Sequence, residues 1–222
     1  MNIYHLEIEL RSDTTFGRGD GVVGLIDQEV EHDAYGFPYL RGRTLKGLLS
    51  EECDNIVASL PAGKVDWNAA LLRLFGIAGS TTATVAAWQI GNACLPEDLR
   101  AAVANMLHDR DSQFTAQDIL ESLTTIRRQT AIHPVAGTPD SGSLRAMRVV
   151  IRDLVFTSRL ETHGSHPEDI ALLAAGCLAL RHIGSGRNRG RGEVRCTLHD
   201  QTYQDMMPTS FAAFARLVKE SA

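Results

Sequence analysis

Alternating apolar and polar residues at the start of the chain predict a half-buried β-strand over residues 2–10. Apolar side chains occupy the even positions from Tyr4 to Leu10, and His and Glu side chains lie between them. This is the period-two pattern of a strand with one buried face. Apolar residues then recur at helical spacing over residues 45–60, with Thr44 as the expected N-cap. The chain therefore begins with a strand followed by a long helix.

A second long helix is expected in the C-terminal half. Ser165 and Glu168 have the spacing of a capping box for a helix that runs to about Arg181. Because that helix is apolar on nearly all sides, it should be buried. The other expected elements are strands over residues 84–94, 147–156 and 194–198 and helices over residues 66–75, 97–107, 116–123 and 211–218.

The core elements follow the order strand, helix, strand, strand, helix, strand. This order predicts an α+β fold with a ferredoxin-like (RRM-like) β-α-β-β-α-β core and long insertions. We expect one domain over residues 1–222, because no linker or internal repeat interrupts the chain. Its expected parts are a core at about 1–60, 84–95 and 147–200, insertions at 61–83 and 96–123, a long loop-rich excursion at about 124–146, and a C-terminal helix at about 208–221.

The basic residues are concentrated in three segments, although the formal net charge is −5. Residues 41–46, 124–152 and 181–195 contain 13 of the 22 basic residues but only two of the 27 acidic ones, Asp140 and Glu193. Such a polarised distribution indicates one surface that binds a polyanion on an otherwise acidic protein. The alternative is three solvated loops that happen to be basic.

Several classes of protein are disfavoured by the sequence. No run reaches the roughly 18 apolar residues of a membrane span, and the first residues lack the pattern of a secretory signal, so a cytoplasmic protein without membrane contact is expected. The four cysteines form no C-x-x-C pair, which predicts reduced and mostly buried thiols. A P-loop is absent, and the glycine spacing does not match a dinucleotide fingerprint.

A glycine-arginine loop, residues 184–192, connects the second core helix to the last strand. Its glycines let the backbone approach a ligand closely, and its side chains Arg187, Arg189 and Arg191 can donate hydrogen bonds to phosphate. The alternative is an ordinary turn, but such a turn would not require three arginines.

The start of the first helix carries three further cations, Arg41, Arg43 and Lys46. Positive side chains in a first turn oppose the helix dipole, so their presence needs an explanation. A bound phosphate supplies one, because the free N–H groups of the helix and these three side chains could converge on it. The alternative is that the side chains extend into solvent.

An acidic stretch over residues 20–33 precedes this helix. A carboxylate there could hold a hydrated divalent cation or orient an attacking hydroxyl in a phosphodiester reaction. Composition alone does not choose among its carboxylates. Those considered are Asp20, Asp27, Glu29, Glu31 and Asp33.

These segments together resemble the RAMP superfamily of CRISPR-associated proteins, and in particular the repeated backbone subunit of type III effector complexes. The matching motifs are Leu25-Ile26-Asp27, Gly36-Phe37-Pro38-Tyr39-Leu40-Arg41-Gly42-Arg43-Thr44-Leu45-Lys46-Gly47, Leu74-Phe75-Gly76 and the late glycine-arginine loop. One departure lies at the helix start, where the family usually has Pro-Gly-Ser-Ser and this chain has Arg41-Gly42-Arg43-Thr44. We interpret the two guanidinium groups as a stronger phosphate clamp.

The resemblance implies a guide (CRISPR) RNA-binding subunit that assembles with adjacent copies or homologous RAMP subunits and other proteins of the complex. It also implies a thumb over residues 124–146 that interrupts the duplex between guide and target RNA. Asp27 matches the residue that cleaves target RNA with a divalent metal ion, here expected to be Mg²⁺. Its expected role is either to bind that metal or to orient the 2′-hydroxyl for in-line attack on the adjacent phosphate. The expected RNA-binding residues are Arg41, Arg43, Lys46, Arg127, Arg128, Arg145, Arg187, Arg189 and Arg191.

Two other functions remain open at this point. The chain could be a non-catalytic guide-binding structural or capping subunit of the same kind of complex, with Asp27 an ordinary loop residue. It could also be a ferredoxin-like ligand-binding domain unrelated to RNA, which the charge distribution disfavours.

Overall fold

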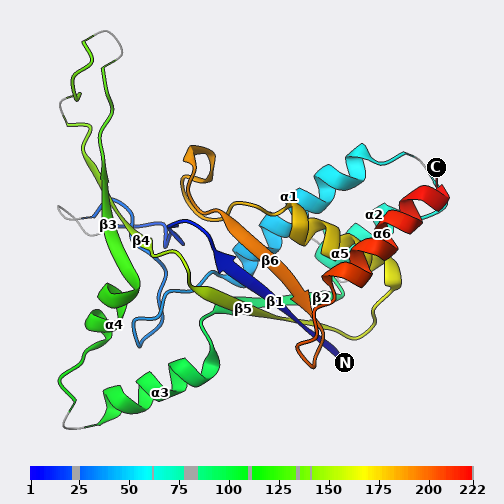
Figure 1. Ribbon diagram of the computed structural model, residues 1–222, viewed down its shortest axis with the longest axis horizontal. Helices are drawn as coiled ribbons and strands as arrows, with labels where there is room; N and C mark the ends of the chain where they lie inside the picture. The colour runs from blue at the N-terminus through cyan, green and yellow to red at the C-terminus, as the bar shows by residue number, and fades with distance from the viewer. Residues whose placement is uncertain are drawn as a thin grey trace.

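The computed structural model describes residues 1–21, 26–61, 63–77, 85–109, 112–133, 136–140 and 142–221. A four-stranded antiparallel sheet lies at its centre (Figure 1). Its order is β2-β5-β1-β6, and two helices, α1 and α5, connect β1 to β2 and β5 to β6. This is the ferredoxin-like β-α-β-β-α-β plan, so the predicted fold class is confirmed. The bounds are β1 Asn2–Leu10, α1 Gly42–Ser59, β2 Trp88–Cys94, β5 Val155–Thr162, α5 Pro167–Ala179 and β6 Val194–His199.

Four helices lie together on one side of the sheet: α1, α5, α2 (Trp67–Phe75) and α6 (Met207–Ser221) (Figure 1). Helix α5 contacts the other three and β6, which confirms its predicted central position. It approaches α1 closely at Gly176, where a Cβ atom would overlap the Sγ atom of Cys53. Glycine at this position therefore sets the distance between the two helices.

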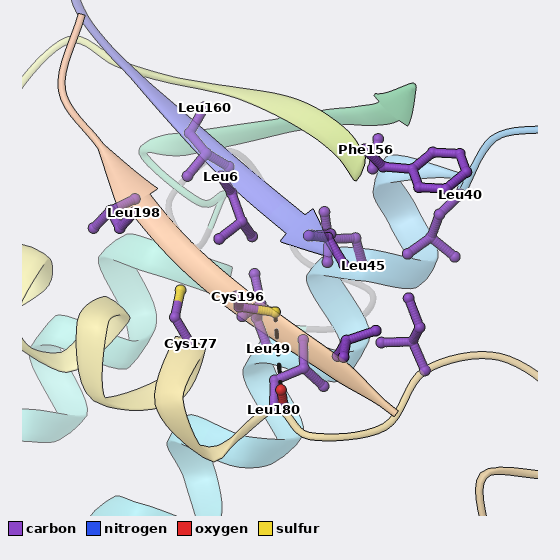
Figure 2. Close-up of a cluster of buried hydrophobic side chains, with 14 of the residues drawn as sticks. Leu6, Leu40, Leu45, Leu49, Phe156, Leu160, Cys177, Leu180, Cys196 and Leu198 are labelled. Carbon is purple, nitrogen blue, oxygen red and sulfur yellow. Dashed lines mark hydrogen bonds between the residues drawn. The ribbon is translucent and has the colours of Figure 1, made fainter. Parts of the chain in front are cut away.

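The core lies between the sheet and these helices (Figure 2). Leu6, Leu160 and Leu198 project from the strands toward Leu45 and Leu49 of α1, and all five side chains are inaccessible to solvent. Removing one such side chain from water contributes about 1.5–3 kcal/mol. The even-numbered face of β1 is therefore what anchors the helical layer.

The four cysteines are free, and three of them lie in this core. Burial raises the pKa of the Cys196 thiol to about 12, and its Sγ atom lies 3.8 Å from the carbonyl oxygen of Leu180 (Figure 2). Burial also raises the pKa values of Cys53 and Cys177. The buried thiols therefore remain protonated and unreactive in the folded protein, as the sequence predicts.

A two-stranded hairpin projects from the body of the molecule (Figure 1). It consists of β3 (Thr124–Gln129) and β4 (Arg145–Val150), and we call it the thumb hairpin. Helices α3 (Glu97–His108) and α4 (Ala116–Leu123) precede it. The excursion predicted over residues 124–146 thus exists, and it extends four residues further to Val150.

The strand predicted over residues 147–156 is wrong. Its first part belongs to β4 of the thumb hairpin, and the core strand β5 begins only at Val155. The two strands are separated by a turn in which Asp153 has a φ of 67°, a conformation that aspartate tolerates better than most residues. Both segments are apolar, so the pattern alone merges them.

Two predicted helix caps also differ from the structure. Helix α1 begins at Gly42, not at Leu45, and its first N–H donates to Oδ1 of Asn92 at 2.8 Å, so Thr44 is not the N-cap. Helix α5 begins at Pro167 after His166 and ends at Ala179, without a side-chain cap.

The hydroxyl of Ser165 serves another purpose. It accepts hydrogen bonds from the Nδ2 atom of Asn2 at 3.0 Å and the hydroxyl of Tyr4 at 3.3 Å, and therefore tethers the start of β1. The capping-box prediction fails because the helix begins at Pro167 with His166 at the N-cap position, which leaves Ser165 one residue too early to cap it. Over the residues described above, no helix is long and apolar enough to cross a lipid bilayer.

Candidate nucleic-acid interface

A surface pocket of about 760 Å³ lies where three distant segments of the chain meet. They are the segment around Asp27, the base of the thumb hairpin and the glycine-arginine loop. Its lining residues are Asp27, Gln28, Gln129, Arg145, Met147, Gly184, Ser185, Gly186, Arg187, Asn188, Arg189 and Arg191. Five of the ten residues predicted to form the functional site thus share one pocket.

The charge of this pocket is strongly positive. Four arginines, Arg145, Arg187, Arg189 and Arg191, line it together with one carboxylate, Asp27. Guanidinium groups are suited to phosphate because they present several donors in a fixed plane. An aromatic ring is absent from the described lining residues, so the pocket offers hydrogen bonds and charge but no platform for base stacking. These features suit the backbone of a nucleic acid.

The glycine-arginine loop is held in place by Thr14 and Thr15, which lie just after β1 and far from the loop in the sequence. The N–H of Ser185 donates to the carbonyl oxygen of Thr15 at 2.9 Å, and the Thr14 hydroxyl donates to the carbonyl oxygen of Ile183 at 2.8 Å. Gly192 has a φ of 71°, and a Cβ atom there would overlap the Ile183 carbonyl. Only glycine fits this position, and the loop therefore presents its arginines from a fixed base.

The four arginines of the pocket differ in their protein partners. Arg187 forms an ion pair with Glu51 of α1, with Nη1–Oε2 and Nη2–Oε1 distances of 3.1 and 3.2 Å. The guanidinium of Arg191 contacts the Sδ atom of Met147. Arg145 and Arg189 form no ion pair with any described residue. At least two cations are therefore available to an anionic ligand.

Asp27 is exposed in the pocket and is bound to the thumb hairpin. The N–H of Ala146 donates to its Oδ2 atom at 2.6 Å, and the N–H of Asp27 donates to the carbonyl oxygen of Ala146 at 2.7 Å. Of the predicted Leu25-Ile26-Asp27 motif, Ile26 is buried and Leu25 lies outside the described residues. The motif thus presents the Asp27 carboxylate from a segment that the thumb hairpin holds on one side.

The other carboxylates of residues 20–33 have cationic partners. The pairs are Asp20 with Arg18 at 2.7 Å, Glu29 with Arg148 at 2.9 Å, Glu31 with Arg41 at 2.6 Å and Asp33 with Arg100 at 2.9 Å. Asp33 also accepts from the N–H groups of Tyr35 and Phe37 and so shapes a turn. Asp27 is the carboxylate of this stretch that has no ion pair among the described residues and that lines the pocket.

The cations at the start of α1 do not converge on one point, which corrects the expectation from the sequence. Arg41 lies in an adjoining pocket of about 250 Å³, which Arg187 also lines. Arg43 and Lys46 line a separate groove beside Phe75 and Gly76. Positions 43 and 46 share one face of the helix, whereas Arg41 precedes it and points elsewhere. The first N–H of the helix is moreover already bound by Asn92 of β2.

Arg41 is held by a buried acid. Burial raises the pKa of Glu31, but the Arg41 guanidinium and the Tyr39 hydroxyl, which donates to Glu31 Oε1 at 2.7 Å, outweigh it and lower that pKa overall. Glu31 therefore remains ionised and keeps Arg41 oriented at the rim of the second pocket.

The two arginines of β3 lie on opposite faces of the thumb hairpin. Arg127 pairs with Met147 and Gln129 with Arg145 across the hairpin, so these residues share the face that borders the large pocket. Arg127 is ion-paired with Asp13 at 2.6 Å. Arg128 is exposed on the other face and does not reach the pocket.

A metal ion could be held here only with help from a ligand. The described part of the chain contains no group of three His, Cys, Asp or Glu side chains that could hold a metal ion. Mg²⁺, however, is commonly bound by one or two carboxylates together with substrate phosphates. Asp27 fits that role as the one protein carboxylate, with RNA oxygens as the remaining ligands.

Four polar residues of the pocket were not anticipated from the sequence: Gln28, Gln129, Ser185 and Asn188. Asn188 lies between two loop arginines, and Gln28 follows Asp27, so their positions next to predicted residues are the only signal in the sequence. Gln129 lines the pocket because it lies on strand β3 of the thumb hairpin, and no local pattern in the sequence indicates this position.

Comparisons with known proteins agree with this architecture. The family description "RAMP superfamily" matches residues 7–195. A subunit in a cryo-EM structure of the type III-B Cmr-β complex bound to cognate target RNA superposes with a TM-score of 0.62 at 11% identity, covering 88% of this chain and 96% of the other. A subunit of the apo state of type III-B Cmr-β gives 0.62 at 12% identity with the same coverage. No curated protein sequence gives a significant match. At this identity, the structural likeness establishes a shared fold.

Proposed function

Because this chain belongs to the RAMP superfamily, we propose that it is a cytoplasmic guide RNA-binding subunit of a type III CRISPR effector complex and cleaves target RNA paired to the guide. The observation that carries the proposal is the pocket that Asp27 lines together with four arginines. Its partners would be the guide RNA, the target RNA, neighbouring RAMP subunits and the other proteins of the complex.

Binding would rest on the sugar-phosphate backbone. Arg145, Arg187, Arg189 and Arg191 can hold phosphates in the pocket, and Arg41 can hold one at the adjoining site. The remaining candidates, Arg43, Lys46, Arg127 and Arg128, lie outside the pocket and would contact the RNA further along its path. Recognition of the backbone without base readout is what a carrier of many different guides requires.

Cleavage would follow the in-line route open to RNA. The 2′-oxygen forms a bond to the adjacent phosphorus while the bond from phosphorus to the 5′-oxygen breaks, the 2′-proton leaves with a base, and the departing 5′-oxygen takes up a proton. Asp27 would orient the 2′-hydroxyl or help to hold a divalent cation, Mg²⁺ by our proposal, which supplies charge stabilisation when bound. The arginines would stabilise the negative charge that develops on the phosphate.

The test uses the assembled complex with its guide RNA and a labelled complementary RNA. We expect Asp27→Ala to abolish cleavage while target binding persists, and chelation of the metal to do the same in the wild type. Asp20→Ala is the matched control, because Asp20 lies in the same acidic stretch but is exposed and paired with Arg18; it should cut like the wild type. Normal cleavage by Asp27→Ala would overturn the catalytic proposal.

The second candidate is a guide-binding structural or capping subunit without activity. It is favoured by the hydrogen bond from the Ala146 amide, which already uses one carboxylate oxygen of Asp27. This candidate predicts the same binding of guide and target, with no cleavage by the wild-type subunit.

A further inference from the structure

The segment that carries Asp27 runs along the outer edge of the thumb strand β4. Besides the two hydrogen bonds between Asp27 and Ala146, the N–H of Arg148 donates to the carbonyl oxygen of Gln28 at 3.0 Å. The side chains of Glu29 and Arg148 then form an ion pair at 2.9 Å, with exposed fractions of 6% and 10%. Three successive residues are thus fixed to β4, and the last of them, Glu29, also exchanges backbone hydrogen bonds with Arg18 and Asp20.

The register of the hairpin shows that these contacts are separate from the pairing of β3 with β4. Ala146 lies opposite Arg128, and Arg148 lies opposite Ile126. In an antiparallel pair, alternate residues direct their N–H and C=O groups away from the partner strand. Since Ala146 directs both groups to Asp27, its amide takes no part in holding the hairpin together.

We propose that the thumb hairpin positions the reactive carboxylate, and that the amide of Ala146 is the group that does so. This inference rests on the proposed function. Ala146 holds both the backbone N–H and the Oδ2 atom of Asp27, so the carboxylate is restricted to one orientation. Its Oδ1 atom forms no hydrogen bond with a described residue and is the oxygen left for the RNA or a cation.

A consequence is that cleavage depends on where the thumb hairpin lies. A displacement of β4 by bound RNA moves the Asp27 carboxylate with it, because Asp27, Gln28 and Glu29 are all attached to that strand. A shift of about 1 Å in a reacting group is enough to lower a rate about a hundred-fold. The hairpin would therefore act as a positioning element in addition to any contact it makes with RNA.

Proline substitution separates this role from the stability of the hairpin. Ala146→Pro removes the amide hydrogen that binds Asp27, and extended backbone at Arg145 is compatible with a following proline. Ile126→Pro is the matched control, because the N–H of Ile126 also points away from its partner strand but faces no part of the Asp27 segment.

We expect Ala146→Pro to lower the single-turnover cleavage rate about a hundred-fold with unchanged target affinity, while Ile126→Pro cuts at close to the wild-type rate. Independently of activity, hydrogen exchange at the Ala146 amide should become faster in Asp27→Ala, because the hydrogen bond is lost. Wild-type cleavage by Ala146→Pro, or unchanged exchange in Asp27→Ala, would overturn the positioning role. If Asp27→Ala itself cuts normally, the proposed function fails instead.

Discussion

The ion pair between Arg187 and Glu51 gives a quantitative test of the RNA-binding surface. Both side chains are partly exposed, at 36% and 52%, so the pair contributes only about 0.2–1 kcal/mol. An RNA phosphate at Arg187 must displace the Glu51 carboxylate. Removing that competitor by Glu51→Gln should therefore tighten RNA binding by about 1.4- to 5-fold, which is the same energy expressed as a ratio.

The opposite change removes the phosphate contact. Arg187→Ala should weaken binding and lower the slope of log affinity against log salt concentration by about 0.7, the value for one phosphate on single-stranded RNA. In the Arg187→Ala background, the gain from Glu51→Gln should shrink, because the cation that Glu51 occupied is no longer present.

The assay is fluorescence anisotropy of labelled single-stranded RNA with the full chain over a series of KCl concentrations. Arg216→Ala, whose side chain is exposed on α6 and does not line the pocket, is a control for loss of one positive charge. If Arg187→Ala and Arg216→Ala change the slope equally, or if neither changes it, then the glycine-arginine loop does not bind phosphate and our reasoning is refuted.

Three further predictions concern the scaffold. Gly176→Ala should reduce the free energy of unfolding by about 1–3 kcal/mol in urea, because its Cβ atom would overlap the Sγ of Cys53; unchanged stability would show that α1 and α5 can separate freely. Arg73→Ala should lower the free energy of unfolding by about 3 kcal/mol, because the wholly buried Asp169 carboxylate loses its ion-pair partner at 2.6 Å. Asp169→Asn in the Arg73→Ala background should recover part of that free energy. At pH 8 the three buried thiols of the folded protein should react slowly with a thiol reagent, and all four thiols should react rapidly in urea, because burial raises the pKa of Cys196 to about 12 and also raises the pKa values of Cys53 and Cys177. Rapid labelling of all four thiols in the folded state would contradict the packing.

Much of the fold could be predicted from residue periodicity. The alternation in β1 reflects burial of one face of a strand, and the apolar character of α5 reflects burial of nearly a whole helix. Both predictions are confirmed. The merged strand over residues 147–156 shows the limit. An apolar run does not reveal that its first half pairs with β3 and its second half with β1, because that choice is made by contacts distant in the sequence.

Individual residues of the functional site could be predicted from the sequence, but their arrangement in space could not. The arginines of the glycine-arginine loop and Asp27 could be singled out from composition and from resemblance, and the structure brings them together. Arg43 and Lys46 looked equally suitable, yet helix geometry directs them into another groove. The link between Asp27 and Ala146 is made by a backbone amide, and no side-chain pattern in a sequence can indicate it.

The central claim, that the Asp27 carboxylate performs the cleavage, is tested most directly by Asp27→Asn in the assembled complex. Asparagine retains an oxygen that can accept from the Ala146 amide and keeps the shape of the side chain, so it removes the charge with little other change. The account predicts that single-turnover cleavage of a complementary RNA falls about a hundred-fold or more, while guide and target binding stay at wild-type levels. Cleavage at the wild-type rate would contradict it and would assign this chain to the structural part of the complex.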